Sequence, residues 1–280
     1  MKLRVKKFQP DKVKHNRIFF IIGKRGTGKT TIMRDILSHY PPVDFAIGMT
    51  PTEETADVFR EFLPETCIYH EFSQHKLEQM LSVQRELIRK KKDRSFLLVL
   101  DDCLYQKGVL KSQAMRDLVF NGRHLHVAVF VCVQYLMDIS PDVRSNIDYV
   151  FALRENIISN RMKLWKFFFG MFSKYDDFAK CMDACTANHQ CMIMDNTQKS
   201  TEIEDTVFWY RAELEPKPYK LGRSCYWKMD AKCRLSAEEM EREEMERLKN
   251  SSSTKDSNRI TTVQTADEMG KPVQGKMLVL

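Results

Sequence analysis

Residues 17–31 read RIFFIIGKRGTGKTT, and this stretch decides the fold. The run Ile18–Ile22 is apolar and rich in β-branched and aromatic residues, which predicts a buried parallel strand. The next eight residues, Gly23–Thr30, match the phosphate-binding pattern G-x-x-x-x-G-K-[ST] in full. Apolar residues at helical spacing follow over Lys29–His39, and a Pro-Pro pair then stops the helix. Strand, glycine-rich turn and helix in this order predict a nucleotide-binding P-loop.

The residues of this loop have separate expected roles. Its glycines let backbone N–H groups converge on phosphate oxygens, and the start of the helix adds a favourable dipole. We expect Lys29 to reach the β- and γ-phosphates as a catalytic residue, the Thr30 hydroxyl to ligate Mg²⁺, and Thr31 to lie near the α-phosphate. The expected ligand is ATP with Mg²⁺, and its binding residues are Gly23, Lys24, Arg25, Gly26, Thr27, Gly28, Lys29, Thr30 and Thr31.

A second apolar run, Phe96–Leu100, ends at two adjacent carboxylates, Asp101 and Asp102. This is the form of a Walker B strand, and we assign Asp101 to Mg²⁺ and Asp102 to the activation or orientation of the attacking water. Intervening strands and helices separate it from the P-loop, which favours the branch of P-loop proteins with an extra strand between the two motif strands. Gln134, after the run Val127–Val133, is then predicted to sense the γ-phosphate. A solvent-exposed Gln at a strand end is the alternative.

Strands alternate with helices through the first 155 residues, which predicts an α/β fold with a mainly parallel central sheet flanked by helices. Residues 157–183 are helical and aromatic-rich, and residues 191–194 and 206–210 are two further strands. The expected organisation is a basic N-terminal arm or lead-in strand at 1–16, a P-loop ATPase domain at 17–235 and a charged tail at 236–280. A charged helical run (238–249) opens the tail, in which we expect disorder or a partner-dependent structure.

Composition narrows the class of protein. Of the 280 residues, 43% are hydrophobic and 30% charged, as in soluble globular proteins. No run approaches the roughly 20 apolar residues of a membrane-spanning helix, and no apolar segment follows the basic start, so we expect no secretion signal. The eight cysteines are then expected to be reduced thiols in a cytosolic compartment. The net charge of +7 is compatible with a polyanionic partner such as nucleic acid.

Six phrases in order carry a resemblance to a known family: 23–31, Met49-Thr50-Pro51-Thr52-Glu53-Glu54, 98–103, 121–124, Val133-Gln134-Tyr135 and 141–146. The set resembles the DNA-packaging ATPases of large nucleocytoplasmic DNA viruses, of the poxvirus and giant-virus type, within the FtsK–HerA group of DNA-pumping motors. The similarity covers about residues 15–235. It implies a RecA-like core that forms a homo-oligomeric ring, binds ATP between neighbours and drives double-stranded genomic DNA into a preformed capsid.

The resemblance also implies an arginine from the adjacent subunit that stabilises charge on the γ-phosphate. Arg123 and Arg144 are the two candidates, and either could instead be a surface residue paired with a carboxylate. DNA contact would come from pore loops or from three basic groups: Lys2–Lys7, Arg85–Arg94 (which could equally be a solvated helix end), and Arg161, Lys163 and Lys166. The implied location is the assembly site in the host-cell cytoplasm and the virion, with a capsid or inner-membrane virion protein as a further partner.

Two other functions and one other site stay open from the residues. A P-loop phosphotransferase of the nucleotide-kinase type would need an arginine-rich lid, of which 154–161 is a poor version. A nucleotide-binding switch or scaffold would use its tail to recruit a partner. Finally, Zn²⁺ could be held by a short cluster in the 181–191 region, although its first two cysteines have the spacing of core cysteines on a helix: Cys181, Cys185, His189 and Cys191.

Overall fold

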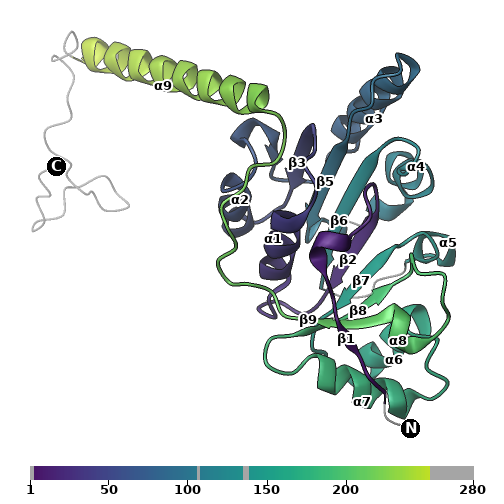
Figure 1. Ribbon diagram of the computed structural model, residues 1–280. Helices are drawn as coiled ribbons and strands as arrows, with labels where there is room; N and C mark the ends of the chain where they lie inside the picture. Colours follow the sequence, from purple (N-terminus) through teal and green to yellow (C-terminus); the bar gives the residue numbers. More distant parts are fainter. Residues whose placement is uncertain (1–2, 106–107, 135–138, 253–280) are drawn as a thin grey trace, which may run out of the picture. The chain divides into compact units, whose positions relative to one another are not determined.

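The computed structural model describes residues 3–105, 108–134 and 139–252. Its centre is a nine-stranded sheet of order β1-β9-β8-β7-β2-β6-β5-β3-β4 (Figure 1). Only β8 is antiparallel to its neighbours among the strand pairs described, so the predicted mainly parallel α/β sheet is confirmed. The strands are β1 (Lys6–Lys7), β2 (Ile18–Ile22), β3 (Phe45–Met49), β4 (Ile68–Tyr69), β5 (Phe96–Asp101), β6 (Val127–Val133), β7 (Tyr149–Ala152), β8 (Cys191–Asp195) and β9 (Val207–Tyr210).

Helices connect these strands and cover both faces of the sheet (Figure 1). They are α1 (Lys29–His39), α2 (Glu53–Arg60), α3 (Gln74–Arg89), α4 (Gln113–Asn121), α5 (Pro141–Arg144), α6 (Ile158–Phe168), α7 (Tyr175–Cys185) and α8 (Ile203–Thr206), and a further helix, α9 (Ser224–Ser252), follows the last strand. Short 3₁₀ turns lie at Pro10–Lys12, Glu65–Cys67, Cys103–Tyr105 and Val109–Lys111. In the part of the chain that the structure describes, no helix combines the length and apolarity needed to cross a membrane.

The two faces of the sheet bury two separate hydrophobic cores because successive side chains of a strand point to opposite faces. Helices α1 and α2 pack on the face that carries Phe19 and Ile21 of β2. Helices α3, α4, α6 and α7 pack on the other face, which carries Phe20 and Ile22. All five residues of β2 are buried. This strand therefore runs through the middle of the molecule and fixes where the P-loop begins.

An aromatic stack crosses the central strands. The Phe19 ring lies 4.1 Å from that of Phe130 on β6 and 4.8 Å from that of Tyr149 on β7, both in parallel stacking. Phe19 is also the backbone partner of both residues in the two parallel ladders. Each such pair contributes about 1 kcal/mol beyond the area it buries. The stack thus favours one register among β6, β2 and β7.

Two segments refine the sequence predictions. The aromatic region 157–183 forms two helices, since the chain turns after α6 and the Trp165 indole N–H donates to the carbonyl of Phe172 across the turn, at 2.9 Å. Helix α9 runs from Ser224 to Ser252, so it includes the charged helical run predicted at 238–249 and begins before the expected boundary at 235. Its Glu, Arg, Lys and Met residues are good helix formers. Residues 253–280 lie outside the described part.

The N-terminal region, expected as a basic arm or lead-in strand, contributes the parallel edge strand β1 and buries Phe8 in the core. At the other end, the chain divides into one compact unit over 1–227 and a second over 228–280. All the site residues predicted from the sequence belong to the first unit.

Replacement of Gly48 by alanine tests the packing of α2 on the sheet. A Cβ at position 48 would lie 2.4 Å from Cδ2 of the buried Phe59 ring. We expect Gly48→Ala to lower the free energy of unfolding by about 1–3 kcal/mol through overpacking. Urea denaturation measures the effect. Gly170→Ala is the control, because a Cβ there meets nothing within 4 Å; equal losses in both variants would contradict this packing.

Candidate nucleotide-binding site

The carboxyl ends of four adjacent parallel strands, β7, β2, β6 and β5, meet at one edge of the sheet. In open α/β sheets, ligands bind outside this edge. The P-loop follows β2, Asp101 ends β5, Gln134 follows β6, and Glu155 comes shortly after β7. The register of the sheet thus brings the predicted P-loop, carboxylates and Gln134 to one place.

The P-loop is closed by its own hydrogen bonds. The backbone N–H and the hydroxyl of Thr27 both donate to the carbonyl of Lys24, at 3.3 and 2.7 Å. Gly28 has φ +96°, a left-handed conformation that side chains rarely adopt. Gly23 is required for space, because a Cβ there would lie 2.6 Å from Thr27 Oγ1 and 2.9 Å from Leu153 Cβ. The loop is thus shaped for close approach of the backbone to phosphate.

Lys29 is buried, with 7% of its surface exposed, and begins α1. Its ammonium lies 3.4 Å from the carbonyl of Lys24, so it points back across the loop. Thr30 and Thr31 occupy the first turn of α1 and are half-buried. The contacts of these residues with phosphate and Mg²⁺ stay predictions.

Asp101 is almost fully buried at the end of β5, with 3% of its surface exposed. Its Oδ2 accepts a hydrogen bond from the Thr55 hydroxyl at 2.9 Å, whereas Oδ1 meets no hydrogen-bond partner of normal geometry among the described residues. Burial raises the pKa of Asp101, the Thr55 bond opposes the rise, and the charge of Asp102 adds to it. A buried carboxylate oxygen without a partner fits a hydrated Mg²⁺, which prefers oxygen ligands and keeps several waters.

Asp102 and Gln134 contact each other directly. The Gln134 side-chain amide donates to Asp102 Oδ2 at 2.7 Å, and the Asp102 N–H donates to the Cys132 carbonyl at 3.2 Å. Asp102 has φ +50°, a left-handed conformation uncommon outside glycine. The structure therefore holds the predicted water-activating carboxylate against the predicted γ-phosphate sensor. Tyr135, which belongs to the resemblance, lies outside the described residues.

Glu155 is a site residue that the sequence analysis did not single out. It is 9% exposed and lies 2.9 Å from the ammonium of Lys24, in the P-loop. It also accepts from the Ile157 N–H at 2.8 Å and from the Asn160 amide at 3.0 Å. Burial would raise the pKa of Glu155, but these bonds and Lys24 together hold it below its ordinary value. Glu155 is thus a charged anchor for the loop.

A chain of threonine hydroxyls is the second feature that the sequence analysis missed. The Thr52 hydroxyl lies 3.3 Å from that of Thr50 and donates to Thr55 Oγ1 at 3.0 Å, and Thr55 in turn donates to Asp101. The sequence analysis used Thr50 and Thr52 only as part of a phrase that carries the family resemblance. Thr55 lies on the first turns of α2, and its contact with Asp101 spans 46 residues, so local pattern gave no signal for it.

Of the two candidate arginines, Arg123 lies away from this edge and Arg144 packs against an aromatic ring. Arg123 pairs with the buried Asp148, which immediately precedes β7 and receives the Ile18 N–H. The guanidinium of Arg144, at the end of α5, lies 3.8 Å from the centre of the Phe167 ring. Five residues of β2 separate Ile18 from the P-loop, about 16 Å at 3.3 Å per residue. Arg123 thus lies at the opposite end of the sheet from the P-loop. Its ion pair with Asp148 is the pairing with a carboxylate that the sequence analysis gave as the alternative role.

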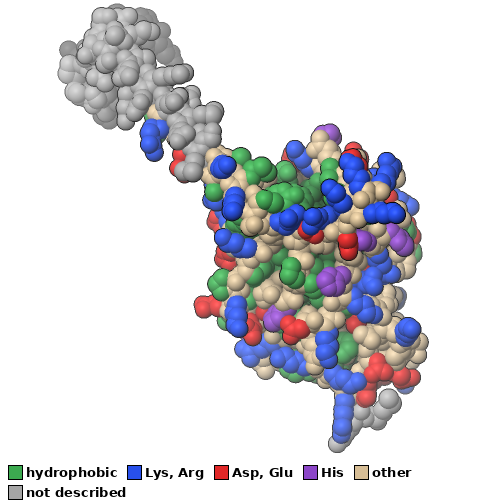
Figure 2. Space-filling model, turned by 45° about the horizontal axis from the view of Figure 1, so that its top comes forward, with side chains coloured by type: hydrophobic (Ala, Val, Ile, Leu, Met, Phe, Trp, Pro, Cys, Tyr) green, Lys and Arg blue, Asp and Glu red, His purple; other side chains and the backbone are tan. Residues whose placement is uncertain are grey.

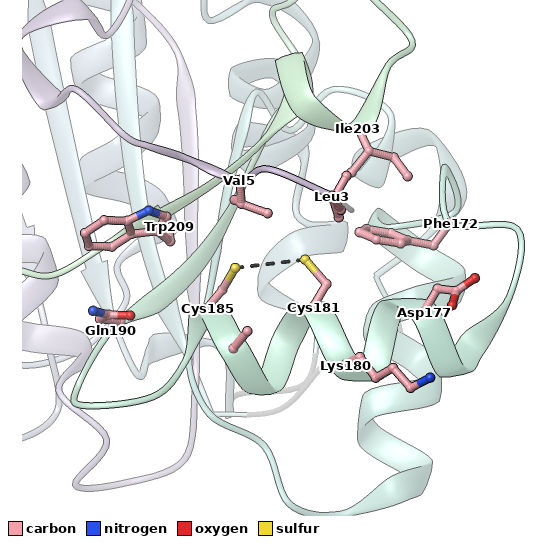
Figure 3. A pocket seen from close by; sticks show the side chains of 11 residues that line it. Leu3, Val5, Phe172, Asp177, Lys180, Cys181, Cys185, Gln190, Ile203 and Trp209 are labelled. Carbon is pink, nitrogen blue, oxygen red and sulfur yellow. Dashed lines mark hydrogen bonds between the residues drawn. The ribbon is translucent and has the colours of Figure 1, made fainter. Parts of the chain in front are cut away.

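The cysteine cluster does not form a metal centre in the described residues, where no group of three or more metal-ligating side chains occurs. Cys181 and Cys185 lie on successive turns of α7 with sulfurs 3.9 Å apart, and His189 is exposed in the next turn. Figure 3 shows both thiols facing a pocket of about 780 Å³ between α7 and β9. The Zn²⁺ site that the sequence left open is therefore not formed among the described residues, because helical spacing brings only two of the ligands together.

Fold and site together define this chain as a P-loop NTPase. The sequence model of the family described as "Poxvirus A32 protein" matches residues 5–215. The chain belongs to this family. The poxvirus side of the resemblance in the sequence is thereby confirmed.

Relatives in other large DNA viruses are similar over most of their length. Uncharacterized protein L437 of Acanthamoeba polyphaga mimivirus is 32% identical over 221 residues, which cover 75% of this chain and 78% of that protein. Uncharacterized protein 015R of Frog virus 3 (isolate Goorha) is 33% identical over 227 residues, which cover 79% of this chain and 69% of that protein.

Solved structures of similar fold include the genome packaging NTPase B204 from Sulfolobus turreted icosahedral virus 2 in complex with AMP. It has a TM-score of 0.51 at 13% identity, over 74% of this chain and 100% of that one. The DNA-packaging ATPase B204 from Sulfolobus Turreted Icosahedral Virus has a TM-score of 0.52 at 13% identity, over 72% and 100% of the two chains. At this identity the likeness shows the fold.

Thr55→Val tests the hydroxyl that holds Asp101. The Thr55 hydrogen bond favours the ionised carboxylate, so its loss raises the pKa of Asp101 further. At a given acidic pH, a higher pKa leaves a smaller fraction of Asp101 ionised. In a plot of kcat/KM for Mg²⁺-ATP against pH, the acidic limb should therefore move to higher pH. Thr55→Ser keeps the hydroxyl and should leave the limb in place. A profile unchanged in Thr55→Val would show that this bond does not govern Asp101.

Proposed function

We propose that this protein is an ATPase that moves double-stranded viral genomic DNA into the capsid during virion assembly. The observation that carries the proposal is the meeting of the P-loop, the buried carboxylate of Asp101 and the Asp102–Gln134 pair at one sheet edge. Membership of the Poxvirus A32 protein family supports it. So does the shared fold with B204, whose structures are described as those of a genome packaging NTPase and a DNA-packaging ATPase.

In the proposed reaction, Lys29 and the loop N–H groups hold the phosphates, while Thr30 and Asp101 hold Mg²⁺, which supplies charge neutralisation when bound. Asp102 orients the attacking water and accepts its proton. A carboxylate can only accept hydrogen bonds, so Gln134 must turn its NH₂ toward Asp102. That NH₂ has a second N–H, which can donate to the γ-phosphate. Gln134 therefore connects the presence of the γ-phosphate to the position of the base.

The second half of the site is proposed to come from a neighbouring copy in a homo-oligomeric ring. Arg123 lies at the far end of its own sheet and Arg144 is held against Phe167, so neither is placed to serve its own P-loop. An arginine supplied in trans stabilises charge on the transferred phosphoryl group. Arg123 already neutralises the buried Asp148 in its own subunit. We therefore favour Arg144 as the arginine that acts on the neighbouring site.

Basic side chains at the end of α3 are proposed to contact the DNA backbone. Within Arg85–Arg94, Arg85 pairs with Asp117, Lys90 with Glu86 and Arg94 with Asp44. Arg89, Lys91 and Lys92 are exposed and have no ion pair in the described part of the chain. Figure 2 shows Lys and Arg side chains gathered around an apolar area in the upper part of its face. Phosphate contacts by such cations are independent of sequence.

Two members of the other basic groups are engaged in ion pairs. Arg161 is 14% exposed and pairs with Asp183 of α7, so it contributes to packing. Lys6 pairs with Asp205, and Lys2 lies outside the described residues. We further propose that the protein acts at the cytoplasmic assembly site of the host cell and in the virion, with a capsid or inner-membrane virion protein as partner.

The first test is hydrolysis with and without double-stranded DNA. We expect DNA of any sequence to stimulate the rate, and the stimulation to weaken steeply as salt rises. Lys29→Ala should lower kcat/KM by at least about 100-fold through lost phosphate stabilisation. Lys199→Ala, at an exposed lysine outside the site, is the matched control. Hydrolysis that ignores DNA would contradict a DNA motor, and phosphoryl transfer to nucleoside monophosphates would indicate a kinase.

Mixing of two inactive variants tests the trans arginine. Lys29→Ala and Arg144→Ala should each be inactive, since each removes one half of every site. In a one-to-one mixture, random pairing should restore about a quarter of the sites. The same mixture with Arg123→Ala shows which arginine acts, with thermal unfolding as the check on its pairing with Asp148. Mixtures that stay inactive for both arginines would contradict a shared site.

A further inference from the structure

The outer side of α6 is an apolar surface. Ile157 is 46% exposed, Ile158 66% and Met162 37%. Ile158 and Met162 are four residues apart and so lie on one stripe of the helix. The other side of α6 packs in the core through Leu164 and Phe168. We call the three exposed side chains, Ile157, Ile158 and Met162, the α6 surface; clustered exposed apolar side chains mark contact sites.

This surface is connected to the P-loop. Glu155 accepts the Ile157 N–H at 2.8 Å and the Asn160 amide at 3.0 Å, and the same carboxylate lies 2.9 Å from the ammonium of Lys24. The start of α6 is therefore fixed to the phosphate-binding loop by charged and polar contacts. A partner on the α6 surface would lie beside the nucleotide.

The chain itself carries a complementary segment, Glu213-Leu214-Glu215. Leu214 is 79% exposed, and both glutamates are exposed beside it. The α6 surface is bordered by exposed cations of the opposite sign, namely Arg154, Lys163 and Lys166. A leucine flanked by carboxylates thus matches an apolar surface flanked by cations, in both polarity and charge.

The two surfaces lie on opposite faces of the sheet. The segment 211–221 crosses the face covered by α1, where Ala212 and Tyr219 pack and the Tyr219 hydroxyl donates to the Arg34 carbonyl at 2.9 Å. Helix α6 belongs to the other face. Two different patches on different sides of one chain are what a head-to-tail contact requires, and such contacts form a ring where the rotation between copies closes.

We propose that the α6 surface of one copy receives Glu213–Glu215 of a neighbouring copy. The inference rests on the ring proposed above and adds the residues that join its members. The contact places each neighbour next to the Lys24–Glu155 pair, so that assembly and the shape of the P-loop are coupled.

Charge substitutions on each side test the contact. Ile158→Glu places a carboxylate against Glu213 and Glu215, and a Leu214→Lys substitution places a cation against the border of α6. Each variant should sediment as the 33.0 kDa monomer at concentrations where the wild-type protein assembles with an ATP analogue. Each should still bind the analogue, which shows that it is folded. Val83→Glu, at a 57% exposed side chain on α3, is the control and should assemble.

The double variant carrying Ile158→Glu and Leu214→Lys in one chain should regain assembly at low salt, because opposite charges then meet between copies. Single variants that assemble, a control that dissociates equally, or a double variant that stays monomeric would each overturn the inference. DNA-stimulated hydrolysis by the wild-type protein is measured in parallel. If it persists while the single variants assemble, the contact alone is wrong; if the wild type neither assembles nor responds to DNA, the proposed function fails as well.

Discussion

The register of three parallel strands, β7, β2 and β6, is the constraint on which the site depends. The Phe19 ring stacks between Phe130 and Tyr149, and backbone bonds continue the two ladders past the strand ends, from the Gly23 N–H to the Val133 carbonyl and from the Leu153 N–H to the Ile22 carbonyl. A slip of one residue would turn every side chain of β2 to the other face. This register places the P-loop, Gln134 and Glu155 together at the carboxyl edge of the sheet.

The polar groups of this edge hold one another in place. Lys29 bonds a carbonyl of its own loop, Gln134 bonds Asp102, and Glu155 holds Lys24. Nucleotide binding would exchange some of these bonds for bonds to phosphate. Asp101 is the exception, because burial raises its pKa and Oδ1 lacks a partner of normal geometry among the described residues. A nearby cation would favour its ionised form.

Local pattern was enough to predict the strand Ile18–Ile22, the P-loop and the helix Lys29–His39, whose bounds the structure reproduces. The pattern of a Walker B strand followed by a strand with a polar residue at its end assigned Asp101, Asp102 and Gln134 to one site. It could not find Thr55 or Glu155, since each acts through a contact between residues far apart in the sequence. Nor could it locate Arg123, whose partner Asp148 lies 25 residues away at the opposite end of the sheet. Aromatic composition concealed the turn between α6 and α7, because apolar residues fill both the helices and the turn.

The central claim is that the isolated chain binds ATP at its P-loop but hydrolyses it only when a neighbouring copy completes the site. The most direct measurement is the hydrolysis rate per chain, followed across a dilution series together with ATP binding and the mass of the assembly. The account predicts that binding persists on dilution while the rate per chain falls in step with dissociation. A rate per chain that stays constant from the assembled to the monomeric range would contradict it.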